Sequence, residues 1–167
     1  MHLHKKMNLT IRSIKPIDNP LIAKIIRDTL TEFNANKPGT VFYDPTTDDL
    51  FHLFTTKGAC YFIAELNGKI AGGCGIYPTP NLPNGCAELV KFYLTTSARG
   101  KGIGKALMLK CFDEATLLGY QQLYLETMPE LAVAVGMYQK LGFKCIDKPL
   151  GNSGHFGCNI WMVKELV

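Results

Sequence analysis

Apolar and polar residues alternate along several short segments, a pattern typical of strands with one buried face. This alternation predicts strands over residues 8–14, 60–66, 69–77, 86–94, 121–126, 143–146 and 158–164. Other segments repeat apolar residues every three or four positions, which predicts helices over residues 18–33, 44–57, 105–118 and 129–141. Because a hairpin meander is combined with crossover helices, we expect an α/β fold built on a mixed sheet.

Glycine and proline mark the boundaries of these segments. Asn67-Gly68 separates two predicted strands and is typical of a two-residue hairpin turn. Gly119 stands where the third helix should end. The segment 78–85 contains three prolines and is expected to stay out of the sheet.

A glycine-rich run, Arg99-Gly100-Lys101-Gly102-Ile103-Gly104-Lys105, joins the strand at 86–94 to the helix at 105–118. Glycine lets the backbone approach a ligand closely and adopt dihedral angles that other residues avoid. The first N–H groups of a helix have no intrahelical partner, and the helix dipole favours negative charge there. With its three basic side chains, the run predicts a site for a phosphate-bearing ligand.

Two common phosphate loops do not fit this run. A P-loop needs Ser or Thr after its Gly-Lys pair, whereas Ala106 follows Gly104-Lys105. The dinucleotide fingerprint, counted from Gly100, needs a glycine where Lys105 stands. The spacing Arg-x-x-Gly-x-Gly at 99, 102 and 104 resembles the pyrophosphate loop of the GNAT superfamily of N-acetyltransferases, which bind acetyl-CoA.

Two flanking segments extend the resemblance. Residues 88–94 resemble the fourth strand of the superfamily, and residues 134–143 resemble its later helix with the Leu-Gly-Phe turn that follows. The likeness covers residues 9–166. It implies a mostly antiparallel sheet of six or seven strands, splayed between strands four and five and flanked by about four helices. We expect a single acetyltransferase domain over residues 1–167, with a disordered start at residues 1–7.

The resemblance implies direct transfer of acetyl from acetyl-CoA to a primary amine of a small molecule or peptide. A non-catalytic acyl-CoA-binding sensor or interaction module is the alternative, because such a module would need only the loop and the strand. The cofactor contacts implied by the resemblance come from Phe92, Tyr93, Leu94, Arg99, Gly100, Lys101, Gly102, Ile103, Gly104 and Lys105.

Two residues are candidates for proton transfer. Glu88 matches the position of a general base, and its alternative role is a salt-bridged glutamate at a strand end. Tyr138 matches the tyrosine that protonates the leaving thiolate, and its alternative role is packing on an amphipathic helix. Many superfamily members carry an asparagine seven residues before this tyrosine, where this chain has Leu131.

The acceptor side of the site is expected from fold analogy. Asn36 and Tyr43 would line one wall, and His155 would approach from the loop before the last strand. A loop histidine such as His155 is also common as plain polar surface.

Composition and charge bear on the class of ligand, the compartment and the presence of a metal site or membrane span. The net charge of +4 is spread along the chain, which argues against nucleic-acid binding and suits an anionic cofactor. The six cysteines form no Cys-x-x-Cys pair, so we expect buried, reduced thiols and a cytoplasmic protein without a metal site. No apolar run is long enough for a membrane span, and the start lacks the apolar core of a signal peptide. We expect a monomer or homodimer.

Overall fold

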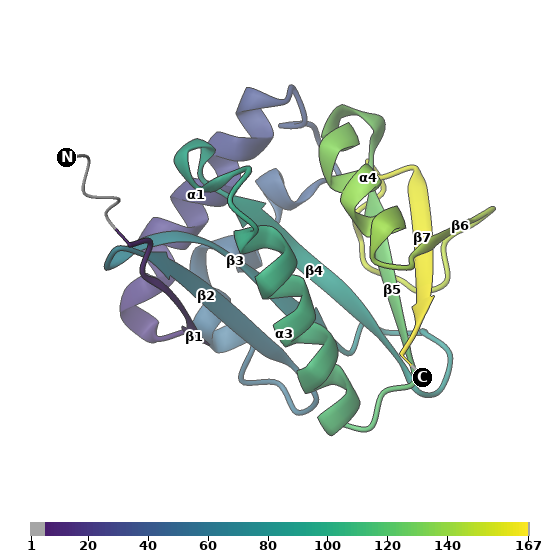
Figure 1. Cartoon of the computed structure of the whole chain (residues 1–167). Coiled ribbons are helices and arrows are strands. Elements are labelled where there is room, and N and C mark those ends of the chain that lie inside the picture. The colour runs from purple at the N-terminus through teal and green to yellow at the C-terminus, as the bar shows by residue number, and fades with distance from the viewer. Residues whose placement is uncertain (1–5, 167) are drawn as a thin grey trace.

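Figure 1 shows the computed structural model, which describes residues 6–166, so most of the predicted disordered start lies outside the described residues. Its sheet has seven strands in the order β1-β2-β3-β4-β5-β7-β6. Their bounds are Leu9–Ser13, Cys60–Leu66, Lys69–Tyr77, Cys86–Leu94, Gln122–Thr127, Lys144–Ile146 and Ile160–Glu165 for β1 to β7. Each neighbouring pair is antiparallel except β4 and β5, which confirms the expected mixed sheet.

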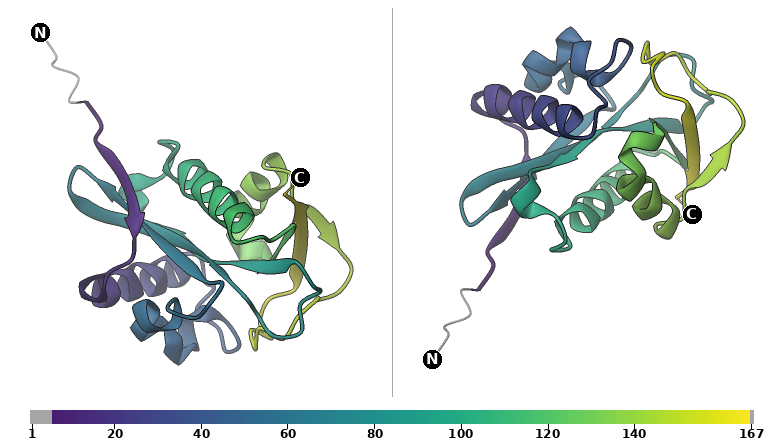
Figure 2. Two further views of the ribbon diagram at one scale, coloured as in Figure 1. Left: turned by 90° about the horizontal axis from the view of Figure 1, so that it is seen from below. Right: turned by 90° about the horizontal axis from the view of Figure 1, so that it is seen from above.

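Helices cover both faces of the sheet (Figures 1 and 2). On one face, α3 (Ile103–Leu117) and α4 (Ala132–Lys140) pack on a core that includes Leu107, Leu123 and Met162. On the other face, α1 (Asn19–Glu32) and the short α2 (Leu50–Leu53) cover a second core. None of the helices within residues 6–166 is long and apolar enough to cross a membrane.

The predicted helix over 44–57 is largely wrong. Residues Pro45–Asp49 form a 3-10 segment, and only Leu50–Leu53 are α-helical. Asp44 caps the first piece, because its side chain accepts from the Thr46 N–H at 2.9 Å. Asp49 caps the second piece by accepting from the His52 N–H at 3.2 Å. Because each cap begins a separate segment, the chain forms two short pieces here in place of one continuous helix.

The hairpin between β2 and β3 forms as the sequence predicts. Asn67 and Gly68 adopt φ values of 52° and 79°, and Leu66 pairs with Lys69. Positive φ at both central residues matches the right-handed twist of the two strands.

A bulge in β4 shapes the centre of the sheet. Gly73 pairs with Tyr93 and Gly75 pairs with Val90, so two residues of β4 lie opposite one residue of β3. Lys91, inside this bulge, has a φ of 51°. The hydroxyl of Tyr61 donates to the Lys91 carbonyl at 2.7 Å. A Cβ on Gly75 would stand 2.6 Å from the Tyr61 ring, so a glycine at this position of β3 makes room for the tyrosine that holds the bulge.

The parallel strands β4 and β5 diverge after a short pairing. Register runs from Cys86–Gln122 to Glu88–Tyr124 and then stops, although both strands continue. Beyond Glu88, the edge of β4 that faces β5 is therefore not paired in the sheet. This is the splay that the resemblance implies.

Candidate functional site

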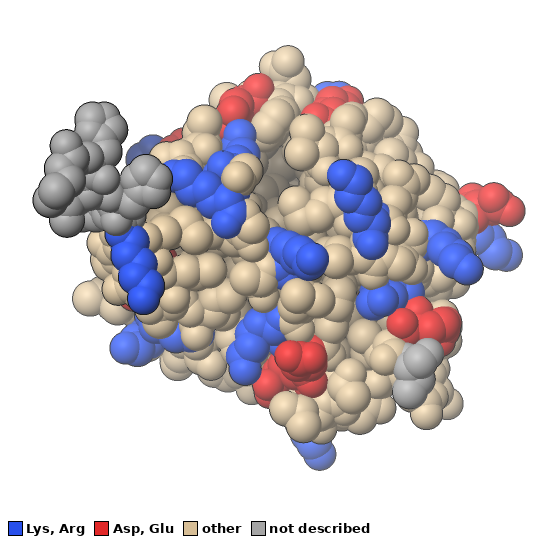
Figure 3. All heavy atoms as spheres, viewed as in Figure 1, with Lys and Arg blue, Asp and Glu red and all other residues tan. Residues whose placement is uncertain are grey.

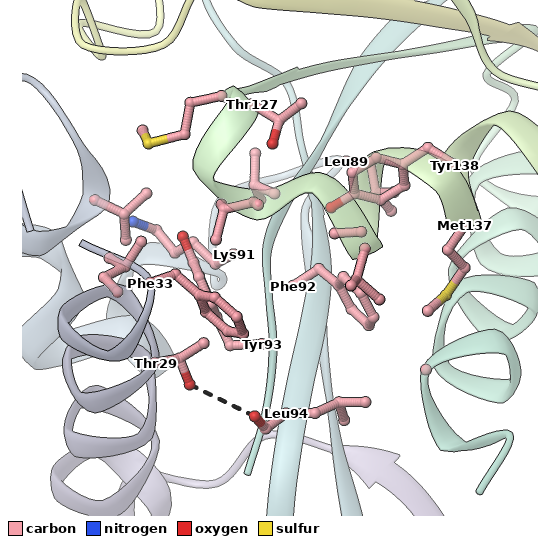
Figure 4. A pocket seen from close by; sticks show the side chains of 18 of the residues that line it. Thr29, Phe33, Leu89, Lys91, Phe92, Tyr93, Leu94, Thr127, Met137 and Tyr138 are labelled. Atoms are coloured by element: carbon pink, nitrogen blue, oxygen red, sulfur yellow. Dashed lines mark hydrogen bonds between the residues drawn. The ribbon is translucent and has the colours of Figure 1, made fainter. Parts of the chain in front are cut away.

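A pocket of about 550 Å³ opens where β4 and β5 diverge. Its walls come from the C-terminal end of α1, the strand residues 88–94, the loop before α3, and the start of α4. Figure 4 shows Phe92 and Tyr138 on one side of β4 and Tyr93 on the other. In Figure 3, a recess opens on the viewed face with basic side chains beside it. The pocket thus reaches from the glycine-rich loop to the end of the β4–β5 pairing.

The glycine-rich loop presents free N–H groups to the pocket. Gly100 and Gly102 adopt φ values of 71° and 78°, and Gly102 caps α3. The first hydrogen bond of the helix runs from the Ala106 N–H to the Gly102 carbonyl at 3.1 Å. Within residues 6–166, the N–H groups of Ile103, Gly104 and Lys105 have no backbone partner. Such free N–H groups at a helix start are the donors that an anion site requires.

Gly104 brings this helix start against the strand. A Cβ at this position would stand 2.9 Å from Phe92 Cζ and 3.3 Å from a Leu94 methyl carbon. The missing side chain therefore lets α3 begin close to β4, at the wall of the pocket. Gly104 and Phe92 both line it.

The basic residues of the loop differ in what they contact. The Arg99 guanidinium pairs with both carboxylate oxygens of Glu32 at 2.8 and 2.9 Å, and donates to the Leu94 carbonyl at 3.0 Å. Arg99 therefore fastens the loop to α1 while still lining the pocket. Lys105 also lines it, whereas Lys101 is exposed, donates to the Ser97 carbonyl at 2.7 Å and lies outside the lining.

Glu88 lies where the β4–β5 pairing ends, and it is 3% exposed. The Thr79 hydroxyl donates to its carboxylate. Burial raises the pKa of Glu88 to about 7, against the lowering effect of Thr79 and with a further rise from the charge of Glu126. A carboxylate that titrates near neutral pH inside a pocket can exchange protons with a bound molecule.

Tyr138 lies on α4 and, in Figure 4, on the Phe92 side of β4. Its ring packs edge-on against Phe92 and Phe143, with centroids 6.2 and 5.9 Å away. Its hydroxyl is directed into the pocket (Figure 4). Burial raises the pKa of Tyr138 well above its usual value, so the side chain is a neutral proton donor.

His155 joins a charged cluster that the sequence did not reveal. Its Nε2 lies 2.8 Å from Asp44 Oδ2, and the Lys91 ammonium lies 3.4 Å from the same oxygen. Although burial acts to raise it, the pKa of Asp44 is held well below its usual range by His155, Lys91 and Thr46. Lys91 could have been noticed in the sequence, because it is a lysine inside an apolar strand segment. Its partner Asp44 is 47 residues away, and no feature of the sequence links the two.

The other two acceptor-side candidates lie elsewhere. Tyr43 is 60% exposed, Asn36 is also exposed, and neither lines the pocket. Their neighbours Thr40 and Val41 line it instead. Leu131, at the position of the superfamily asparagine, gives an apolar lining there. Within residues 6–166, no group of three His, Cys, Asp or Glu side chains could hold a metal ion.

The described cysteines are all unpaired, as the sequence predicts, but they are not uniformly buried. Cys74, Cys86 and Cys111 are buried, whereas Cys145 on the edge strand β6 is exposed. Burial raises the pKa of Cys86 to about 11.

Comparison with known proteins decides the family. The model of the acetyltransferase (GNAT) family matches residues 23–143, which include the β4 edge, the glycine-rich loop and Tyr138. The chain belongs to the GNAT family. As a GNAT protein it is an acyltransferase, and its curated relatives are named N-acetyltransferases.

One GNAT relative is an uncharacterized N-acetyltransferase, YjgM, of Escherichia coli (strain K12), 38% identical over 89% of this chain and 90% of its own length. N-acetyltransferase 8B of Homo sapiens is 34% identical over 67% of this chain, which spans 52% of that protein's length.

Solved GNAT structures share the fold. An acetyltransferase from Staphylococcus aureus Mu50 superposes with a TM-score of 0.85 at 21% identity, covering 96% of this chain and 100% of its own. The PaiA N-acetyltransferase of Thermoplasma acidophilum, solved in complex with coenzyme A, gives a TM-score of 0.74 at 17% identity, covering 95% and 99%.

Proposed function

We propose that this protein transfers acetyl from acetyl-CoA to a primary amine of a small molecule or peptide. The observation that carries the proposal is that one pocket joins an anion-binding helix start, an unpaired strand edge, a buried carboxylate near neutral pKa and a neutral tyrosine. Each of these features meets one need of acyl transfer to an amine.

The residues present fit coenzyme A. Free N–H groups at the start of α3, with Lys105 beside them, suit a pyrophosphate. The edge of β4 at Phe92 offers backbone groups to an amide-bearing chain, as a sheet edge does to an added strand, whereas the Leu94 carbonyl already accepts from Arg99. The walls are completed by Tyr93, Ile103, Gly100 and Gly102, and Gly104 lets the helix start approach β4 closely. When bound, acetyl-CoA supplies an acyl group already activated as a thioester.

Glu88 accepts the proton of the acceptor. An alkylamine arrives mainly as the ammonium ion, since its pKa is about 10, and it must lose a proton before it can attack. A carboxylate with a pKa of about 7 is partly ionised at neutral pH and is a stronger base than an exposed glutamate. The nearby carboxylate of Glu126 adds negative charge that attracts the ammonium.

Tyr138 supplies the proton that the leaving sulfur needs. Its high pKa keeps the hydroxyl protonated, and the donor comes from α4 whereas the base, Glu88, comes from β4. A backbone N–H on the unpaired part of β4, that of Leu94 in this proposal, stabilises the negative charge that develops on the acyl oxygen.

The proposal places the protein in the cytoplasm as a monomer or homodimer. The unpaired state of its cysteines supports a reducing compartment. Transfer of this kind needs no metal, and neither nucleic acid nor a membrane takes part.

Two measurements test the proposal. Acetyl-CoA at about 100 times its Kd should raise Tm by roughly 5–10 °C for a chain of this size. Thiol release from acetyl-CoA, followed across a panel of amines, should exceed the rate without enzyme. No Tm shift would reject cofactor binding. A Tm shift without acetylation of any amine would favour the alternative, a non-catalytic acyl-CoA-binding module.

A further inference from the structure

A buried lysine lines the pocket without a role in the proposed chemistry. Lys91 is 7% exposed, although lysine is almost never this buried unless it is paired. The bulge in β4 places it there, because the φ of 51° breaks the alternation of side chains along the strand. In Figure 4 it lies on the Tyr93 and Phe33 side of β4, away from Tyr138 and Phe92.

The pairing of this ammonium is incomplete. Its recorded partner within residues 6–166 is Asp44 Oδ2 at 3.4 Å, longer than the 2.7–2.9 Å of a typical charge-assisted hydrogen bond. Asp44 is already engaged, since Oδ1 accepts from Thr46 and Oδ2 lies 2.8 Å from His155 Nε2. An ammonium has three N–H donors, so Lys91 keeps capacity for a second anion. Burial lowers its pKa, which an added anion would offset.

The pocket therefore carries opposite charges at neighbouring places. Glu88 and Glu126 line it with carboxylates, and Lys91 lines it with an ammonium three positions along β4 from Glu88. The phosphate-binding helix start is a separate feature of the lining, built by α3 and its preceding loop. A molecule that bears both an amine and a carboxylate matches this arrangement of charges.

We propose that Lys91 binds a carboxylate of the acceptor, so that the preferred acceptors are amino acids rather than simple amines. This inference rests on the proposed acetyl transfer and names its substrate class. Lys91 acts as a specificity-determining residue: it holds the acceptor's carboxylate while Glu88 accepts the proton of its amine.

The test compares amino acids with their carboxamides as acceptors. For alanine, phenylalanine and glutamate, kcat/KM is measured for the amino acid and for the matching α-carboxamide. In wild type we expect the free carboxylate to be favoured. Lys91→Met, which keeps the unbranched side chain but lacks the ammonium, should lower the acid-to-amide ratio by roughly 10- to 100-fold. Taking the ratio of variant to wild type cancels the different reactivity of the two amines.

Asp44→Asn is the matched control. It removes the carboxylate that competes for Lys91, but also the charge that helps keep the buried ammonium protonated. Measured toward the acidic end of the pH range, where Lys91 stays charged, the acid-to-amide ratio should be unchanged or higher than in wild type. If the cluster is purely structural, both variants should slow the acid and the amide equally. That outcome, or an amide preferred by wild type, would overturn the proposal.

Binding measurements separate this proposal from the proposed function. Calorimetry with the three amino acids, in the presence of coenzyme A, should show weaker binding to Lys91→Met than to wild type by a similar factor. If Lys91→Met instead loses the acetyl-CoA-induced Tm shift, Lys91 belongs to the cofactor side and the inference is wrong. If amines are acetylated without any carboxylate preference, the acetyl transfer stands and the substrate class fails.

Discussion

Glu88 shows how one residue's surroundings can set its chemistry. The end of the β4–β5 pairing buries it, burial disfavours its charged form, and Thr79 partly compensates by donating to it. The result is a carboxyl group whose pKa of about 7 lies where a base at neutral pH is most effective.

This environment predicts the pH dependence of the reaction. Because the pKa of Glu88 is raised to about 7, its basic form appears as pH rises, and kcat/KM should climb through that value. Glu88→Gln should lower kcat/KM by at least about 100-fold and abolish this rising limb of the pH profile. Thr79→Val removes a hydrogen bond that lowers the pKa of Glu88, so the limb should move to higher pH. If kcat/KM of Glu88→Gln still rises with pH as in wild type, another group is the base.

Tyr138 can be tested by removing its hydroxyl alone. Tyr138→Phe keeps the ring and its contacts with Phe92 and Phe143 but removes the proton donor. A thiol with a pKa of about 8.5 leaves as thiolate without help, though more slowly. We therefore expect kcat to fall roughly 10- to 1000-fold while the acetyl-CoA-induced Tm shift is retained. Unchanged kcat, with chemistry shown to be rate-limiting, would leave Tyr138 a packing residue.

At the scale of elements, the site depends on how α3 begins. The helix starts against β4 because Gly104 has no side chain, and its first N–H groups remain free because the backbone turns at Gly102. The strand contributes an edge that β5 leaves unpaired. Neither element forms a site alone.

Substitutions of two glycines test this arrangement. Gly104→Asp places a carboxylate against Phe92 and beside the anion site, so it should abolish the acetyl-CoA-induced Tm shift. Gly136→Ala in α4 is the control, since a Cβ there meets no atom within 4 Å and φ is not positive. It should stabilise the free protein by about 0.5–1 kcal/mol and leave the shift intact. If folded Gly104→Asp still shows the acetyl-CoA-induced Tm shift of wild type, the phosphates of the cofactor bind elsewhere.

At the scale of the whole molecule, the sequence predicts what depends on local pattern. Alternation located the strands, Asn67-Gly68 located the hairpin, and the glycine-rich run located the start of α3. The Lys91–Asp44–His155 cluster could not be predicted in this way. It requires a bulge that redirects one side chain and contacts across 47 and 111 residues, which no local pattern encodes.

The distribution of cysteines predicts a property of the whole chain. Non-reducing denaturation should expose all six as free thiols. Under native conditions Cys145 should react first with an alkylating reagent, because it is exposed while burial raises the pKa of Cys60 and Cys158 to about 12. Mass spectrometry identifies the alkylated cysteines under each of the two conditions. A native disulfide would contradict the fold and the proposed compartment.

We propose that one pocket both binds acetyl-CoA and delivers its acetyl group to an amine. Incubation of wild type with isotopically labelled acetyl-CoA and the amine panel, followed by mass spectrometry, tests it most directly. We expect label on the nitrogen of at least one amine, one free thiol for each acetylated amine, and loss of both with Gly104→Asp. Thermal stabilisation by acetyl-CoA with no labelled amine in the panel would contradict it.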